Sequence, residues 1–432
     1  MKKVFFILAA ALTALVACNK AESSQTLADV PSGRSARVSI SLAGGNVTKA
    51  LPVASDEVAI HTVDAFVFNS TADLDAYGHY TASDFTTTAG VTTLNDGKEL
   101  ECTTGSGKFV YIIINGNDTN LDTGEVPYAS IMNEAQLKAR IFKLEDNKQG
   151  SPATLDNFQM IGRTTGLTFT AGDNDVDVEV VRPVARVVIK KITKKFTNAG
   201  LAAGEMKVKN IYMSNVVGKY TYGNIADGVY NLNASSLAAA LPAASWHNKY
   251  DPTADPKDID IEAGYDLWLN RGLASDVAFG ANTTDPLAGV SKTTDIESTF
   301  YVMPNDVAWG FDHDSNAGTA DIFGPVGGDS WSARHTKLVI ETEYAGKTYY
   351  YAIPIAENGI AGTFKHLGSA EDDGSAYAGI KANRSYEINE LILTRLGSTN
   401  PDEPTVEAYV NFKISVQDWN VVLLGADGVY QI

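Results

Sequence analysis

The stretch from Val406 to Val416 carries an apolar residue at every second position, with mostly polar residues between them. Successive side chains of a β-strand point to opposite faces, so this period of two predicts a strand with one buried face. So regular a strand needs an apolar groove to cover that face. Its apolar positions are Val406, Ala408, Val410, Phe412, Ile414 and Val416, and Trp419 follows as an anchor for the end of the strand.

A polar spacer with two prolines, Gly397 to Pro404, precedes this strand. Proline fixes φ and lacks an N–H donor, so the spacer can neither continue a sheet nor build a helix. The sequence therefore predicts a loosely tethered strand, which leaves two alternatives open. It is either an edge strand of its own domain, with a core tryptophan, or a donor strand that reaches another molecule.

The N-terminus has the pattern of an export signal. Two lysines precede an apolar run from Val4 to Val16, and Leu15 to Cys18 fits a bacterial lipobox, in which the cysteine thiol is lipidated and the chain is cut before it. We therefore expect a lipoprotein with lipidated Cys18 as its first residue. Asn19 stands where an aspartate would retain the protein in the inner membrane, which favours the outer membrane. An ordinary signal peptide that ends in cysteine is the alternative.

Length and composition predict a soluble, β-rich protein once the signal is removed. The 432 residues suffice for two domains, and 44% of them are hydrophobic. A formal charge of −18 without a basic stripe excludes nucleic acid as a partner. Many short alternating segments indicate β-sandwiches. Strands are expected at Val58–Asn69, Lys108–Asn115, Val208–Met213, Ser298–Met303, Lys337–Tyr344, Thr348–Ile355 and Ser385–Leu393, and a helix at Ser130–Leu144.

Catalytic and metal-binding patterns are scarce. The six histidines form no pair at metal-ligand spacing, and with Cys18 lipidated, Cys102 has no disulfide partner. We expect Cys102 to be a small buried hydrophobic residue, and the alternative is that its thiol is a catalytic nucleophile. The carboxylates of Asp173, Asp175, Asp177 and Glu179 alternate with valines in part of their run, which indicates a solvated strand face in preference to a calcium site. We expect no enzyme, no metal and no cofactor.

A short alternating strand near the N-terminus, with Val38, Ile40 and Leu42 on one face, precedes a loop from Ala43 to Lys49. Two glycines and an asparagine mark this loop as exposed, so a protease could cut it. Further on, Pro183 interrupts two alternating stretches, and its missing ladder donor suggests a kink or a crossing between domains.

These features form an ordered set that resembles the Bacteroidia-type fimbrillins, the type V pilins. The set consists of the lipobox, the strand before the Lys49–Ala50 bond, and the segments Val181–Ile189, Gly346–Tyr351, Asn383–Ile388 and Asn400–Trp419. The resemblance implies an all-β fold with minor α content: two β-sandwich domains in tandem, transthyretin-like in the family, with a detachable first strand and a C-terminal donor strand.

The resemblance also implies a sequence of export, proteolytic processing and assembly. Such subunits are exported as lipoproteins, trimmed by a trypsin-like protease in the loop after the first strand, and polymerised in fimbriae on the cell surface. The matching bond is Lys49–Ala50, with lysine where compared members have arginine, and Arg34 and Arg37 are the alternative sites. Cutting at either arginine would leave Val38, Ile40 and Leu42 on the retained chain, which favours Lys49.

The expected mechanism is donor-strand exchange. Cleavage would let the first strand leave with its palmitate-bearing tether, and the C-terminal strand of a second copy would fill the groove in a head-to-tail polymer. Other partners are further fimbrial subunits and an unknown surface ligand. The main rivals are a non-polymerising outer-membrane lipoprotein that binds a glycan or a host protein, and an accessory or tip subunit. The predicted divisions are 1–17 (signal peptide), 18–49 (tether and removable strand), 50–175 and 176–396 (two domains), and 397–432 (spacer and donor strand).

Overall fold

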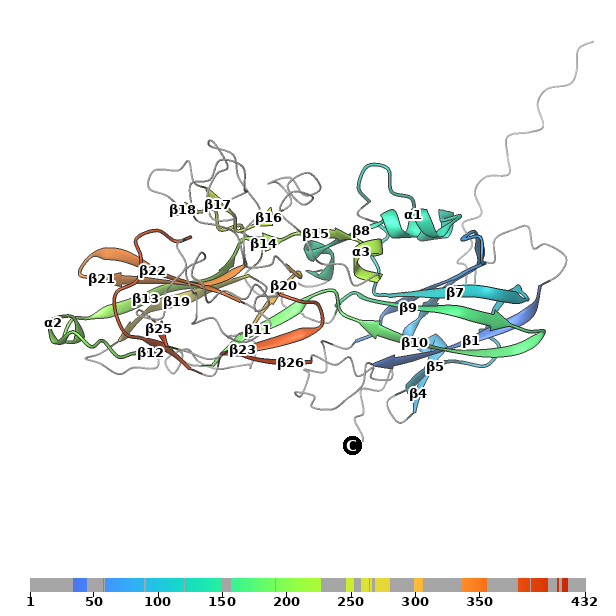
Figure 1. The fold of residues 1–432 in the computed structure, drawn as a ribbon, viewed down its shortest axis with the longest axis horizontal. Coiled ribbons are helices and arrows are strands. Elements are labelled where there is room, and N and C mark those ends of the chain that lie inside the picture. The colour runs from blue at the N-terminus through green and yellow to red at the C-terminus, as the bar shows by residue number, and fades with distance from the viewer. Residues whose placement is uncertain are drawn as a thin grey trace, which may run out of the picture.

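A computed structural model gives the fold, which consists mostly of β-strands with a few short helices and confirms the expected all-β class (Figure 1). Strands β1 to β7, β9 and β10 occupy one end of the long axis, and most strands from β11 onward occupy the other (Figure 1). The structure describes residues 34–44, 57, 59–88, 91–119, 121–148, 157–190, 192–226, 246–251, 258–263, 265, 269–279, 299–305, 336–355, 380–388, 390–402, 410–411 and 414–418.

The N-terminal part of the described chain is built on one nine-stranded sheet in the order β3-β2-β7-β9-β10-β1-β5-β4, with β6 also paired to β1. Strand β10 shows why these segments are strands: Val176, Val178 and Val180 are buried and alternate with exposed carboxylates. The strands are β1 Arg34–Gly44, β2 Thr62–Phe68, β3 Leu74–Thr81, β4 Phe85–Thr88, β5 Val91–Leu94, β6 Leu100–Thr103, β7 Gly105–Ile114, β9 Met160–Phe169 and β10 Gly172–Val181.

Three larger sheets make up the C-terminal part, as far as the structure describes it, in the orders β20-β11-β23-β26, β12-β24-β25 and β19-β13-β21-β22. Strands β21 and β22 form a hairpin through Ala345 and Gly346, which both have positive φ, as a tight two-residue turn requires. The strands are β11 Ala185–Ile189, β12 Ile192–Lys194, β13 Met206–Ser214, β19 Asn270–Phe279, β20 Thr299–Val302, β21 Lys337–Tyr344, β22 Lys347–Pro354, β23 Arg384–Ile388, β24 Leu391–Leu393, β25 Val410–Asn411 and β26 Ile414–Asp418.

The helix expected at Ser130–Leu144 is wrong in extent, because α1 covers only Glu134–Ala139. The Asn133 side chain caps its start by accepting from the Gln136 amide. Beyond it, β8 (Ile141–Lys143) pairs with β15 (Lys219–Thr221), a partner distant in sequence that overrides the helical pattern. The other short elements are α2 Ala199–Ala202, α3 Tyr222–Ala226, η2 Ala82–Asp84, η3 Tyr128–Ser130, η4 Leu144–Lys148, and the pairs β14 Val216–Val217 with β16 Trp246–His247 and β17 Tyr250–Asp251 with β18 Asp258–Ile259. Among the described residues, no helix is long and apolar enough to cross a membrane.

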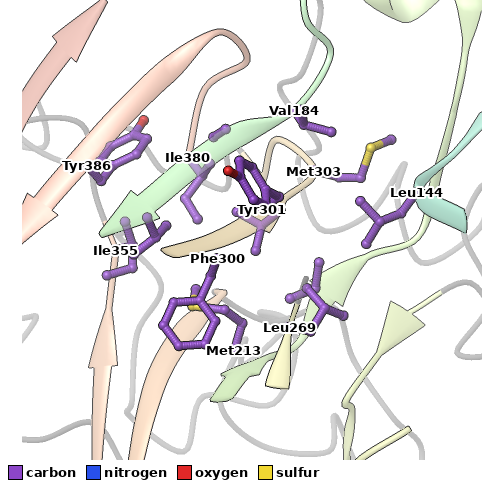
Figure 2. Close-up of a cluster of buried hydrophobic side chains, with 14 of the residues drawn as sticks. Leu144, Val184, Met213, Leu269, Phe300, Tyr301, Met303, Ile355, Ile380 and Tyr386 are labelled. Carbon is purple, nitrogen blue, oxygen red and sulfur yellow. The ribbon is translucent and has the colours of Figure 1, made fainter. Parts of the chain in front are cut away.

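The chain passes from the first sheet to the next between Val181 and Ala185, so Pro183 lies at the crossing that the sequence predicted. The predicted division between residues 175 and 176 falls inside β10, whose alternation continues to Val181. The two parts also share a core. Leu144, from the first part, lies close to Leu269 and Met303 of the second (Figure 2).

Candidate functional site

Strand β1 lies inside the first sheet, not at its edge. Residues 36–44 pair in parallel with residues 172–180 of β10. On its other side β1 is antiparallel to β6, with Ala36 opposite Cys102 and Val38 opposite Leu100, and then to β5. The backbone of this short N-terminal segment is therefore hydrogen-bonded on both sides (Figure 1).

The inward face of β1 fills a closed apolar slot. Ala36 is 1% exposed, and Val38, Ile40 and Leu42 are 0% exposed. We call this slot the β1 groove. The buried side chains around it that also lie on the neighbouring strands are Val176 and Val178 of β10, Leu100 and Cys102 of β6, and Leu94 of β5. Burying the three larger β1 side chains contributes roughly 1.5–3 kcal/mol each, so the first sheet depends on its first strand.

The outward face of the same region is polar and acidic. Asp173, Asp175, Asp177 and Glu179 are all exposed on β10. Arg37 pairs with Asp173 at 2.7 Å, with both side chains more than half exposed. The run of carboxylates is thus a solvent-facing strand surface that lies alongside β1.

The alternative cleavage sites both lie within β1. Arg37 pairs with Glu101 and Asp173 in the two ladders. The Arg34 guanidinium donates to the carbonyl oxygens of Glu101, at 3.1 Å, and Asp75. Lys49 and Ala50 lie outside the described residues, and Lys49 is five positions beyond Gly44, where β1 ends.

Glu57 fixes the chain just after this loop. Its carboxylate accepts from the Tyr301 hydroxyl at 2.5 Å and lies 3.4 Å from the Arg186 guanidinium, while its carbonyl accepts from Arg182 Nε at 3.0 Å. Glu57 is 2% exposed. Arg182 lies in the crossing itself, whereas Arg186 and Tyr301 lie in β11 and β20 of the second part, so Glu57 holds the chain after the loop at the junction of the two parts. Sequence reasoning missed this cluster, because Glu57 is more than a hundred positions from each of these partners.

The C-terminal strand lies on its own molecule. Strand β26 pairs antiparallel with β23, with Ile414 opposite Ile388 and Asp418 opposite Arg384, and it is the end strand of its sheet in the described part of the chain. Val410 in β25 lies opposite Leu393. Of the other predicted positions, Val416 belongs to β26, while Val406, Ala408, Phe412 and Trp419 lie outside the described residues.

The spacer before this strand is not loose, so that part of the prediction is wrong for Gly397 to Asp402. Ser398 exchanges two backbone hydrogen bonds with Tyr350, at 2.7 and 3.0 Å. Asp402 is 3% exposed and accepts from Lys337 Nζ at 2.5 Å and from Asn215 Nδ2 at 3.0 Å. These distant partners, invisible in the sequence, hold the spacer to β13 and β21–β22. We call the contacts of Asp402 with Lys337 and Asn215 the spacer anchor.

Comparison with known proteins indicates a family. The sequence profile described as "Major fimbrial subunit protein (FimA)" matches residues 36–215, which run from the third residue of β1 through the rest of the first sheet to just beyond β13. This match supports a family of Bacteroidia-type fimbrillins for the chain. Members of that family are structural subunits of cell-surface fimbriae, and the family is not one of enzymes.

Solved structures share the fold of this chain. A fimbrilin of Porphyromonas gingivalis W83 has a TM-score of 0.52 at 16% identity, covering 90% of this chain and 99% of that one. A protein assigned to cell adhesion from Bacteroides eggerthii DSM 20697 has a TM-score of 0.53 at 16% identity, over 90% and 97% of the two chains. One from Parabacteroides distasonis ATCC 8503 has 0.52 at 13% identity, over 89% and 97%.

The second cysteine of the chain, Cys102, faces the β1 groove. It is 0% exposed and lies opposite Ala36. Burial, with a smaller contribution from the Asp75 carboxylate, raises the pKa of the Cys102 thiol to about 12. Since the thiolate is the reactive form, Cys102 is inert in this state. The interpretation as a buried small hydrophobe is confirmed. Among the residues that the structure describes, no group of three or more His, Cys, Asp or Glu side chains could hold a metal ion.

Proposed function

We propose that this fimbrillin is a stalk subunit of surface fimbriae that polymerises by donor-strand exchange after a trypsin-like protease has removed its first strand. Before the cut, a lipid on Cys18 tethers the precursor to the outer membrane. Two β-sandwich domains in tandem form the body of the subunit. The C-terminal strand of one copy replaces β1 of the next.

The interior position of β1 carries this proposal. A strand with neighbours on both sides leaves two unpaired sheet edges and an apolar slot when it departs. Such an edge is a template for another strand, because its N–H and C=O groups lack partners. The C-terminal strand has the required alternation, and β-augmentation would restore both ladders.

The unequal pairing of the two strands favours exchange. Strand β1 pairs with β10, β6 and β5, whereas β26 pairs with β23 alone among the described residues. Releasing the C-terminal strand breaks its described pairing along one side, that of β25 with β24 and of β26 with β23, whereas entering the β1 groove makes pairing along two sides. Burying five apolar side chains gives a gross gain on the order of 10 kcal/mol before ordering and association costs.

The direction of growth follows from where the two elements lie. Strand β1 belongs to the first sheet, and the C-terminal strand extends from β23 and β24 in the second part (Figure 1). Groove and donor are thus different surfaces, and their contact is heterologous. A heterologous contact that does not close into a ring propagates as a filament.

The positions of the basic residues support Lys49 as the cut site. A protease needs a segment whose backbone is free to enter its active site, and Arg34 and Arg37 have their backbones in the sheet. A cut after Lys49 leaves all of β1 on the released piece, because β1 ends at Gly44. The retained piece stays fixed seven residues later, at Glu57.

Lys49→Gln is expected to block both processing and polymer formation, because trypsin-like proteases require a basic residue before the cut bond. The matched control is Arg37→Gln, which removes a basic residue of β1 whose ion pair with Asp173 is exposed. The control should be processed normally. N-terminal sequencing of material sheared from the cell surface is expected to give Ala50. Processing of Lys49→Gln at an arginine of β1 would contradict the assignment.

Cys102 is expected to report on the departure of β1. In the uncut precursor, burial should protect the thiol from N-ethylmaleimide, whereas the cut subunit without β1 should react at the rate of an exposed thiol. Polymerisation should then restore the protection. Mass spectrometry of the Cys102 peptide in the three states measures this, with urea-unfolded protein as the control. Equal protection before and after loss of β1 would mean that no open groove forms.

The rival functions predict other products. A non-polymerising surface lipoprotein would be recovered as a monomer that keeps lipidated Cys18, and an accessory or tip subunit would occur in few copies per fibre. The C-terminal alternation favours a stalk subunit, because a stalk subunit must offer a donor strand to its neighbour. Subunit counting in purified fibres separates these outcomes.

A further inference from the structure

If donor-strand exchange operates as proposed, the sizes of the β1 side chains determine how the donor enters. We infer that the donor runs in the same direction as β1, parallel to β10, with Ala408 at the site of Ala36. Val410, Phe412 and Ile414 then take the sites of Val38, Ile40 and Leu42. This register is specific to the residues of this chain.

The four sites of the β1 groove increase in size along the strand. The first holds Ala36, opposite Cys102 on β6 and Gly172 on β10. The next holds Val38, opposite Leu100. The last two hold six-carbon residues, Ile40 and Leu42, opposite Val176 and Val178. All four side chains are at most 1% exposed, so each site is closed to solvent.

In the proposed register the donor reproduces this gradient. Alanine replaces alanine and valine replaces valine at the first two sites, and isoleucine replaces its isomer leucine at the last. The third site exchanges Ile40 for the larger Phe412. Close-packed interiors tolerate swaps that conserve volume and penalise both cavities and overpacking.

Shifted registers fit worse. With Val406 at the first site, valine crowds Cys102, while alanine underfills the site of Val38 and valine that of Ile40. With Val410 at the first site, valine again crowds Cys102, and Phe412 replaces Val38. Each missing or added methylene group in a packed core is destabilising.

The reversed direction also fits worse. With Phe412 kept at the third site, Val416 would replace Ala36, Ile414 would replace Val38 and Val410 would replace Leu42. Besides the third site, two further sites would then be overfilled and one underfilled. A reversed donor would also become antiparallel to β10 and parallel to β5 and β6, so neither wall would recover the hydrogen-bond pattern that it has with β1.

Charge fixes which face of the donor points outward. Lys413 takes the position of Ser41, which lies opposite the exposed Asp177. Shifting the donor by one residue would bury Lys413 in the apolar groove. Shifting it by two residues keeps Lys413 on the outward face, opposite the exposed carboxylates of β10. Charge thus excludes the odd registers, and side-chain size selects among the even ones.

Cysteine cross-linking tests the register, because the native Cys102 lies opposite its first site. Fimbriae assembled from Ala408→Cys are treated with diamide, the oxidant that accepts the two electrons and two protons of the thiols. Non-reducing gels should then show the monomer band shifted to a ladder of covalent oligomers. Dithiothreitol should collapse the ladder, and Cys102→Ala in the same chain should abolish it.

Three variants make the outcome decisive. In the uncut precursor, Ala36→Cys should form an internal disulfide with Cys102, which shows that the geometry permits the bond. Val406→Cys and Val410→Cys should stay monomeric on the gel. If Val406→Cys or Val410→Cys gives the ladder and Ala408→Cys does not, the register is wrong. The register is also wrong if none of these three donor variants gives a ladder although the Ala36→Cys control cross-links. If fibres also form after deletion of all residues beyond Pro404, strand exchange itself fails.

Discussion

Replacing Phe412 and Ile414 with aspartate is expected to give a processed, folded fimbrillin that stays monomeric. Both side chains belong to the buried face of the proposed donor strand. Losing their burial removes roughly 1.5–3 kcal/mol each, which weakens each joint by about two to four orders of magnitude at 1.4 kcal/mol per tenfold. Each carboxylate placed in an apolar groove adds a desolvation cost of several kcal/mol. Size-exclusion chromatography after proteolytic processing should therefore show monomer alone.

The matched control for this double substitution is Asn411→Asp with Ser415→Asp. These substitutions add the same two charges to the opposite face of the same strand. In the polymer that face would point to solvent, beside the exposed carboxylates of β10. Repulsion between exposed charges is weak and is screened at physiological salt, so polymer should still form. Circular dichroism of both variants checks the fold. Intact polymer from Phe412→Asp with Ile414→Asp would contradict burial of this face in a neighbour.

Local pattern was enough to predict much of the fold. The first strand alternates so regularly that its faces could be assigned from sequence, and the structure buries Val38, Ile40 and Leu42. The turn at Ala345 and Gly346 was equally readable, because glycine suits the positive φ of a tight hairpin. Such features depend on neighbours within a few residues.

Distant partners account for what the sequence did not reveal. The pairing of β8 with β15 ends the helix before the helical pattern of the sequence does, and no residue near Ile141 signals that pairing. The spacer looked loose because its prolines and polar residues exclude regular structure, yet Asp402 finds Lys337 and Asn215 far along the chain. Likewise, no local signal places β1 between β10 and β6. That position is what makes its removal consequential.

Under the proposed function, the spacer anchor would determine where the donor strand begins and where pulling force enters the subunit. Since Asp402 is held inside the second part, the segment free to leave for a neighbour begins at Glu403. Pulling force along a fibre would pass through the backbone at Asp402 into β21. The anchor therefore sets both the reach of the donor strand and the point at which load enters the subunit.

Lys337→Met is expected to destabilise the subunit strongly, because it leaves the Asp402 carboxylate buried without its cation. Lys337 is 0% exposed and its Nζ donates to both the side chain and the carbonyl of Asp402. Breaking a buried pair on one side typically costs about 3–5 kcal/mol. For a part of this size, that lowers the melting temperature by on the order of 10 °C. Differential scanning calorimetry of the uncut protein measures the effect.

The double substitution Lys337→Met with Asp402→Leu separates pairing from packing. Removing both charges leaves no uncompensated ion, so the double variant should be more stable than Lys337→Met alone, which a double-mutant cycle reports as coupling. Lys207→Met is the matched control in the same sheet, since its ion pair with Glu205 spans 3.6 Å at the surface. That control should change stability by less than about 1 kcal/mol. A loss from Lys337→Met no larger than that of Lys207→Met would show that Asp402 is not held by its charge, and the pairing of Ser398 with Tyr350 would then be what fixes the spacer.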